Sequence, residues 1–202
     1  MLEKKYQHTI GIDEVGRGPL AGPVMAGAVL LYKVSRLDTA ILQELRDSKK
    51  LTAAKREEFY DSLTNHPNII WGIGEASEKV IDRINIFEAT KLAMVRAIEA
   101  LKKKLDKDIK IDNIVIDGRM SLDIDIPQLS IAKADEKILS CSIASIIAKV
   151  KRDRLMDKYH ALYPDYGFKT HKGYGTKQHM DALSKYGPCD IHRKSFYPVS
   201  TL

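Results

Sequence analysis

Two short apolar segments of this 202-residue chain end in carboxylates, which restricts the fold because β-strands bury charge only at a high cost. The segment TIGIDE closes on Asp13 and Glu14, and the segment IVID closes on Asp117. A third apolar segment, Leu129–Ala132, is followed closely by Asp135. If the three segments are neighbouring strands, their ends bring four carboxylates to one edge of a sheet.

The spacing of apolar residues predicts five strands and a set of helices. The predicted strands are His8–Asp13, Val24–Leu31, Ile69–Ile73, Ile114–Ile116 and Leu129–Ala132. The predicted helices are about Ala40–Arg46, Ala53–Leu63 with Thr52 as N-cap, Ile86–Leu105, Leu139–Tyr159 and Lys177–Tyr186. Three sequential strands before a long helix favour an antiparallel meander that leads into a parallel portion. The predicted fold class is therefore α/β, a mixed five-stranded sheet flanked by helices.

The positive charge of the chain is concentrated near its C-terminal end. Residues 1–148 carry 22 basic and 22 acidic side chains, whereas residues 149–202 carry 11 basic and 5 acidic ones and so account for the formal charge of +6. The second segment also holds eight of the fourteen aromatic residues. This mixture suits a nucleic acid, although a solvated helical face with rings that cover the core has the same composition. We expect residues 149–202 to form a helical part packed on a core of residues 1–148, within one structural unit.

Composition argues against several classes of protein. Cys141 and Cys189 are far apart and form no CxxC pair, so neither a zinc site nor a disulfide framework is indicated. The polar N-terminus lacks the apolar core of a signal peptide, and the longest apolar run, Val24–Tyr32, is far short of a membrane-spanning helix. We therefore expect a cytoplasmic protein without membrane contact. The C-terminal SFYPVSTL lacks an obvious clamp-binding motif and no segment resembles a dimer seam, so we infer no protein partner and expect a monomer.

The four carboxylates predict a metal site. Like charges held close together repel and raise each other's pKa, and hard divalent cations such as Mg²⁺ or Mn²⁺ relieve this through oxygen ligands. Two such ions about 4 Å apart are the usual apparatus for in-line hydrolysis of a phosphodiester. In a regular strand Asp13 and Glu14 face opposite sides, so both reach one site only if the strand ends or bends there. Taken singly, an Asp at a strand end is more often a turn residue.

Three loops offer candidate residues for binding a substrate. In the sequence Gly16-Arg17-Gly18 the glycines let the backbone approach a ligand, and the Arg17 guanidinium can reach a phosphate. The segment DSKKL places Lys49 near a helix start, although a solvated loop is the simpler interpretation. The segment HKGYGT combines Lys172 and Tyr174 with glycine bends, which suits a tyrosine presented to a sugar, with a core-covering tyrosine as the alternative.

Seven segments share an order and spacing that are far more specific than any single motif. They are GIDEVGRGPLAGPV (11–24), DSKKL (47–51), IDRINIFEAT (81–90), IVIDG (114–118), SIASIIAKVKRD (142–153), YGFKTHKGYGT (166–176) and HRKSF (192–196). In these segments the chain resembles the type 2 ribonucleases H, the ribonuclease HII family, over essentially its full length. The resemblance implies a ribonuclease H-like fold in which residues 1–148 form the catalytic core.

The resemblance also implies an activity. The implied reaction is Mg²⁺- or Mn²⁺-dependent endonucleolytic cleavage of the RNA strand of RNA–DNA hybrids and of duplex DNA that contains embedded ribonucleotides. The cut lies 5′ to the ribonucleotide and leaves a 3′-hydroxyl and a 5′-phosphate. The implied partners are therefore RNA–DNA hybrids and ribonucleotide-containing duplex DNA.

By the same resemblance, Asp13, Glu14, Asp117 and Asp135 match the four catalytic carboxylates that hold the two ions. We expect Asp13 and Asp117 to be ligands shared by both ions, and Glu14 and Asp135 to complete the coordination shells of the two ions. The family often has Lys-Gly-Asp where this chain has Lys133-Ala134-Asp135, and this departure puts the backbone path at Asp135 in question.

The resemblance assigns the substrate contacts as well. Gly16-Arg17-Gly18 matches the loop whose backbone reads the ribose and its flanking phosphates, and Tyr174 matches the tyrosine at the RNA–DNA junction. Lys49 and Lys172 are further substrate-binding candidates. Only the 2′-hydroxyl separates ribose from deoxyribose, so a ring packed on the neighbouring deoxyribose would clash with a second 2′-hydroxyl. We expect this clash to favour RNA-to-DNA junctions.

Three alternatives stay open. A type 3 ribonuclease H-like enzyme degrades hybrids but generally leaves single ribonucleotides uncut, and its N-terminal substrate-binding extension has no counterpart before the first predicted strand. A non-catalytic hybrid-binding module of the same fold is disfavoured by the four carboxylates. A metal-dependent enzyme that acts on a small phosphorylated substrate is disfavoured by the basic C-terminal segment.

Overall fold

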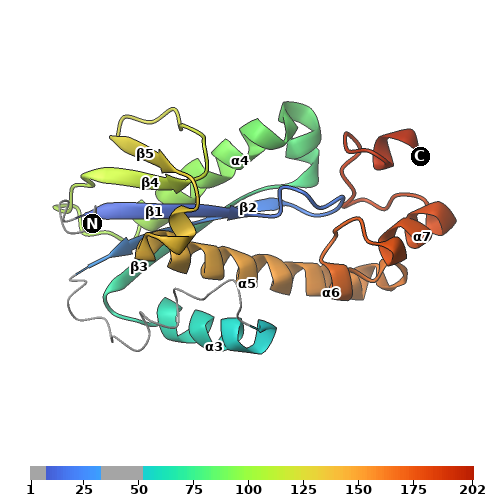
Figure 1. The fold of residues 1–202 in the computed structure, drawn as a ribbon, viewed down its shortest axis with the longest axis horizontal. Helices are drawn as coiled ribbons and strands as arrows, with labels where there is room; N and C mark the ends of the chain where they lie inside the picture. Colours follow the sequence, from blue (N-terminus) through green and yellow to red (C-terminus); the bar gives the residue numbers. More distant parts are fainter. Residues whose placement is uncertain (1–7, 33–51) are drawn as a thin grey trace.

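The computed structural model describes residues 8–32 and 52–202, so the helix predicted near 40–46 and Lys49 lie outside the described residues. Within these ranges one mixed sheet of five strands has helices on both faces (Figure 1). The strands are β1 (Thr9–Val15), β2 (Val24–Leu31), β3 (Ile69–Ala76), β4 (Asn113–Asp117) and β5 (Gln128–Ile131). The α-helices are α3 (Ala53–Thr64), α4 (Glu78–Lys102), α5 (Leu139–Leu162), α6 (Phe168–His171) and α7 (Lys177–Tyr186). In the described ranges the short 3-10 helices are η3 (Ala134–Glu136), η4 (Pro164–Tyr166) and η5 (Val199–Thr201).

The strand order is β3-β2-β1-β4-β5, and the strand directions match the predicted topology. β1 pairs antiparallel with β2, and β2 pairs antiparallel with β3. β4 then pairs parallel with β1, and β5 pairs parallel with β4. The predicted α/β class, with a meander that leads into a parallel portion, is confirmed.

The first strand continues past the point where the sequence predicted its end. Glu14 and Val15 pair with Ala26 and Met25 of β2, so the strand is regular through both carboxylates. The prediction that this strand closes at Asp13 and Glu14 is therefore wrong, because β2 supplies backbone partners for two further residues. As a result, the two neighbouring carboxylates leave opposite faces of the sheet.

One face of the sheet is covered by α4, where residues such as Ile12 and Met94 share the larger hydrophobic cluster. This helix begins earlier than the predicted Ile86–Leu105 and is kinked at Asn85, which has a φ of 66°. The Asn85 side-chain oxygen accepts hydrogen bonds from the backbone N–H groups of Phe87 and Glu88. The second half of α4 therefore begins where the sequence predicted, with Asn85 as its cap.

The opposite face is covered by α5, with α3 packed beside it (Figure 1). α5 approaches the sheet closely because its first half carries small residues. A Cβ atom added at Gly27 of β2 would lie 2.5 Å from the carbonyl oxygen of Ala144, which is closer than real Cβ contacts allow. α5 then extends beyond the sheet to the C-terminal segment, as the orange helix in Figure 1 shows.

The C-terminal segment has a small hydrophobic cluster of its own. Phe168 and Leu183 pack there with Met156 of α5 and with Leu20 from the loop after β1. Residue 148, where we expected the boundary between the two parts, lies inside α5, so this one helix belongs to both.

Among the described residues, no helix is long and apolar enough to span a bilayer.

We predict that Gly27→Ala destabilises the protein by about 1–3 kcal/mol, because the added methyl group overpacks the contact with α5. Urea unfolding of the variant and the wild type measures the difference. Glu75→Ala, at an exposed position of β3, is the matched control and is expected to change the unfolding free energy by less than about 0.5 kcal/mol. Equal stability of Gly27→Ala and the wild type would contradict the close packing of α5.

Candidate active site

The parallel pairing of β1 with β4 places two aspartates side by side. Ile12 pairs with Ile116, and the next residues along the two strands are Asp13 and Asp117. Because side chains alternate between faces along a strand, both aspartates share the face that the start of α5 covers. The register of two strands thus fixes the relative position of two carboxylates.

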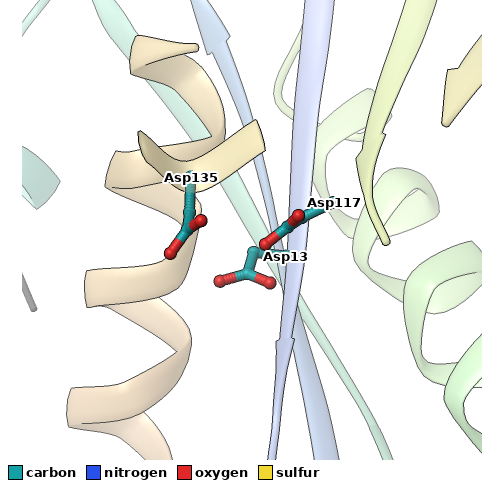
Figure 2. A group of neighbouring side chains, drawn as sticks. All are labelled: Asp13, Asp117 and Asp135. Atoms are coloured by element: carbon teal, nitrogen blue, oxygen red, sulfur yellow. The ribbon is translucent and has the colours of Figure 1, made fainter. Parts of the chain in front are cut away.

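Asp135 completes a group of three carboxylates. It lies in η3, between β5 and α5, and each of the three aspartates offers an oxygen atom within 4.8 Å of the others (Figure 2). Asp117 accepts a hydrogen bond of 2.9 Å from the backbone N–H of Ala134, which ties η3 to the end of β4. Lys133 supplies the left-handed turn before it, with a φ of 58°. The alanine at position 134 therefore leaves Asp135 within the cluster.

The electrostatics of the cluster are dominated by Asp13. Burial raises the pKa of Asp13 to about 7, and repulsion from Glu14 and Asp117 adds to this effect. A hydrogen bond with the Ser145 side chain acts in the opposite direction and lowers the pKa. Near neutral pH, Asp13 therefore takes up a proton unless a cation offsets the negative charge around it.

Glu14 adjoins the three aspartates but is not one of the group. Its Oε1 atom lies 3.3 Å from Nη1 of Arg17. Its Oε2 atom is buried and has no hydrogen-bond partner among the described residues. Burial raises the pKa of Glu14, the Arg17 guanidinium lowers it, and the charge of Asp117 raises it again. The structure thus brings together three of the four predicted carboxylates, with the fourth within electrostatic reach.

This donor set fits a hard divalent cation. Carboxylate oxygens are the ligands that Mg²⁺ and Mn²⁺ prefer, and imidazole and thiolate ligands, which suit softer metals, are absent from the group of three. Burial and repulsion raise the pKa of Asp13, and Oε2 of Glu14 has no hydrogen-bond partner in the described residues, so a cation near these oxygens would stabilise their charged forms.

Arg193, which is fully buried, holds the glycine-containing loop after β1 in place from the protein interior. Its guanidinium donates hydrogen bonds to the carbonyl oxygens of Gly16, Arg17 and Gly22. Burial lowers the pKa of Arg193 to about 9, so the group stays charged at neutral pH. Gly16 has a φ of 88°, a conformation that other residues rarely adopt.

A second fully buried arginine, Arg152 of α5, holds the other end of the same loop. Its three donor nitrogens bind the carbonyl oxygens of Ala21, Pro23 and Lys172 at 3.0–3.1 Å. Arg152 therefore joins the loop between β1 and β2, residues 16–23, to the loop between α6 and α7, residues 172–176. We call these the glycine loop and the tyrosine loop. Burial lowers the pKa of Arg152.

Tyr174 lies opposite the glycine loop. A Cβ atom added at Gly18 would lie 3.7 Å from Cε1 of Tyr174, a residue that is 44% exposed. The structure therefore brings the predicted tyrosine and the predicted glycine loop together. The ammonium group of Lys172, by contrast, forms an ion pair with Asp157.

Several cations of the basic segment, residues 149–202, have partners within the protein, whereas contact of this segment with a nucleic acid stays a prediction. Two of its cations, Arg152 and Arg193, are buried and bind backbone carbonyls instead. Several of its lysines form ion pairs with acidic neighbours: Lys149 with Asp153, Lys172 with Asp157, and Lys177 with Asp181. The positioning roles of the two arginines have no signature in the sequence, because composition does not show that a charged residue is buried. The contact of Ser145 with Asp13 depends on how α5 packs on the sheet, which the sequence does not show either.

The sheet topology, with carboxylates on β1, β4 and η3, defines the ribonuclease H-like class of metal-dependent nucleases. The family model for Ribonuclease HII matches residues 10–199 of the chain. The chain therefore belongs to the ribonuclease HII family and is a metal-dependent endoribonuclease. Ribonuclease HII of Bacillus licheniformis is 51% identical over 194 residues, which cover 96% of this chain and 71% of the relative.

Solved structures share the fold. The ribonuclease H2 of Pyrococcus horikoshii OT3 is 27% identical and aligns with a TM-score of 0.73 over 96% of both chains. The ribonuclease HII of Archaeoglobus fulgidus, solved as a complex with PCNA, aligns with a TM-score of 0.75 at 22% identity, over 94% of this chain and 95% of that one. Bst-RNase HIII in complex with Mn²⁺ aligns with a TM-score of 0.71 at 16% identity, over 96% of this chain and 68% of that one. The last two resemblances are of fold alone.

We predict that Asp13→Asn stabilises the metal-free protein more at pH 8 than at pH 5. The folded-state pKa of Asp13 is raised from 3.8 to about 7. The folded protein thus binds this proton more tightly than the unfolded chain, and the stability gained from it is lost as the pH rises through 7. Asparagine is neutral at every pH and removes this loss.

Urea unfolding at both pH values in the presence of EDTA tests this prediction. Asp123→Asn, which removes an exposed carboxylate, is the control and is expected to change the unfolding free energy by less than about 0.5 kcal/mol at either pH. A stability difference between Asp13→Asn and the wild type that is the same at pH 5 and pH 8 would contradict the raised pKa.

Proposed function

We propose that the protein cuts the RNA strand of RNA–DNA hybrids and cuts duplex DNA on the 5′ side of an embedded ribonucleotide. The observation that carries the proposal is the group of Asp13, Asp117 and Asp135, with oxygen atoms within 4.8 Å of one another, in a chain of the ribonuclease HII family. The reaction is the hydrolysis of one phosphodiester bond, which leaves a 3′-hydroxyl and a 5′-phosphate.

Two divalent ions, Mg²⁺ or Mn²⁺, suit this donor set. Asp13 and Asp117 would be shared ligands, and Asp135 would complete the coordination shell of one ion. Glu14 starts on the opposite face of β1, but it lies near enough for the charge of Asp117 to raise its pKa, and its side chain would complete the shell of the other ion. Such ions, when bound, supply an activated water and stabilise the charge on the leaving oxygen. The protein keeps its ligands in place before any ion arrives, through the β1–β4 register and the hydrogen bond from Ala134 to Asp117.

The backbone of the glycine loop is arranged to read a ribose. In a trans peptide the carbonyl of one residue and the N–H of the next point in opposite directions. Because Arg193 binds the carbonyls of Gly16 and Arg17, the N–H groups of Arg17 and Gly18 point away from its guanidinium. Amide groups held in this way can bind a 2′-hydroxyl without reading the identity of the base.

The ring of Tyr174 would contact the sugar that follows the ribonucleotide. It faces Gly18 and is exposed enough to pack on a deoxyribose. A second 2′-hydroxyl at that position would clash with the ring, so the site would favour a ribonucleotide that is followed by DNA.

We predict that Asp117→Asn lowers the cleavage rate by about three orders of magnitude, because an amide is a far poorer ligand for a hard cation than a carboxylate. Single-turnover cleavage of a duplex with one ribonucleotide, in Mg²⁺ and in Mn²⁺, measures the loss. Binding of the same duplex in EDTA is expected to stay within about threefold of wild type, since the loops that contact it are unchanged. Near-wild-type cleavage by Asp117→Asn would exclude the metal role, and Asp123→Asn serves as the unaffected control.

We predict that Tyr174→Ala reduces the preference for a single embedded ribonucleotide over a run of ribonucleotides. The measurement is the ratio of the cleavage rates on the two substrates, and the expected change is about tenfold, because the substitution removes both the packing of the ring on the deoxyribose and its clash with a second 2′-hydroxyl. Tyr186→Ala, which removes another exposed ring of the C-terminal segment, is the control. An unchanged ratio in Tyr174→Ala would rule out the junction role of this ring.

A further inference from the structure

A buried pair of histidines lies beneath the tyrosine loop. Nε2 of His179 is 2.9 Å from Nε2 of His192, and Nδ1 of His179 is 2.9 Å from the carbonyl oxygen of Tyr174. Their exposed fractions are 0% and 1%, so neither ring reaches solvent or substrate. A contact between two imidazole nitrogens requires one to donate and the other to accept, so the partners of each ring determine where its proton sits.

The hydrogen-bond partners select one tautomer for each ring. A carbonyl oxygen only accepts, so Nδ1 of His179 carries the proton and its Nε2 accepts. Nε2 of His192 then donates, so its Nδ1 carries no proton and accepts from the backbone N–H of Cys189 at 2.9 Å. The Sγ and carbonyl oxygen of Cys189 lie near the same nitrogen, at 3.1 and 3.3 Å, and the oxygen receives no hydrogen bond from it in this tautomer. Burial lowers the pKa of both rings to about 4, which keeps both neutral at pH 7. One directed chain of hydrogen bonds therefore runs from Cys189 through the two histidines to Tyr174.

The carbonyl oxygen of Tyr174 and the backbone N–H of Gly173 form further hydrogen bonds. The backbone N–H of Thr176 also donates to the Tyr174 oxygen, at 2.8 Å, so this oxygen accepts two hydrogen bonds. His171 stacks on His179 with ring centroids 4.5 Å apart and accepts a hydrogen bond from the backbone N–H of Gly173. The histidines thus hold the two consecutive residues at the tip of the loop.

His192 is followed directly by Arg193, and the two side chains hold different loops. The guanidinium of Arg193 binds the glycine loop through the carbonyls of Gly16 and Arg17. The imidazole of His192 binds the tyrosine loop through His179. Two adjacent residues therefore connect the backbone that would read the ribose with the backbone that carries the tyrosine.

We propose that His192, acting through His179, is a positioning residue that holds the ring of Tyr174 at a fixed place against the glycine loop and thereby sets the preference for a single ribonucleotide over a run of them. This inference rests on the proposed function. A small displacement of a ring that discriminates by contact with one sugar is enough to change rates severalfold. The general cleavage machinery at the three aspartates is not part of this chain of hydrogen bonds.

Two substitutions at one position isolate the hydrogen bond. His192→Phe keeps a ring of similar shape but gives His179 no donor, whereas His192→Gln places an amide N–H near the position of the imidazole Nε2. Neither preserves the imidazole Nδ1, so the difference between them isolates the donor to His179. We expect His192→Phe to change the ratio of cleavage rates, single ribonucleotide over a run, by about threefold or more, and His192→Gln to stay within about twofold of wild type.

A double-mutant cycle with Tyr174→Ala separates positioning from general damage. If His192 acts through the tyrosine ring, His192→Phe changes the ratio in the wild type but not in the Tyr174→Ala background. The proposal is overturned if both rates fall together with the ratio unchanged, if folded His192→Gln is as impaired as His192→Phe, or if the effect persists without the ring. Circular dichroism and thermal unfolding establish that each variant is folded.

The outcomes separate this proposal from the proposed function. If Tyr174→Ala leaves the ratio at the wild-type value, the junction role of the ring fails first, and the positioning role fails with it. If Tyr174→Ala changes the ratio but His192→Phe does not, only the positioning role fails. Nitrogen-15 NMR of the imidazoles in the wild-type protein provides a test that needs no variant. We expect the Nδ1–H tautomer for His179 and the Nε2–H tautomer for His192 at pH 7, and the opposite tautomer of His179 would overturn the proposal.

Discussion

Repulsion among Asp13, Asp117 and Asp135 is the constraint on which the rest of this structure depends. Three carboxylates with oxygen atoms within 4.8 Å of one another do not stay together by attraction, so the backbone must hold them. Parallel pairing fixes the first two, and a hydrogen bond from Ala134 ties the third to the second. The same arrangement buries Asp13 and raises its pKa to about 7, and a divalent cation at the three oxygens would offset the repulsion.

The two buried arginines solve a different problem, which is to keep an irregular loop rigid. Each guanidinium binds three backbone carbonyls, so six carbonyl oxygens of the loops around Gly16 and Lys172 gain charged donors. A guanidinium suits this task because its planar donors point in fixed directions and it remains charged at neutral pH. Carbonyl dipoles do not cancel a charge as a carboxylate does, so both cations still contribute a positive potential beside the site.

Much of the fold follows from local patterns, whereas the details of the site do not. The five strands and their order along the chain were predictable because each is a short apolar run, and the parallel portion followed from the long helix before it. The end of β1 was not, since the partner strand β2 decides it, and the separation of Asp13 from Glu14 depends on that end. The roles of Arg152 and Arg193 were also hidden, because a sequence does not distinguish a buried arginine from one that faces phosphate.

Helix α5 begins beside the aspartates and continues past the edge of the sheet to the tyrosine loop (Figure 1). On this helix Ser145 forms a hydrogen bond with Asp13, and Arg152 donates one to the carbonyl oxygen of Lys172. The two residues are seven positions apart, which is about 10 Å along the helix axis. The helix therefore fixes the distance between the aspartates, where a strand would be cut, and the tyrosine loop, where the ring of Tyr174 would contact the adjoining sugar. Insertion of one residue between Ser145 and Arg152 would turn the guanidinium by about 100° around the helix axis. The aspartates and Tyr174 would both remain, but the helix would no longer hold them at the distance that one substrate spans.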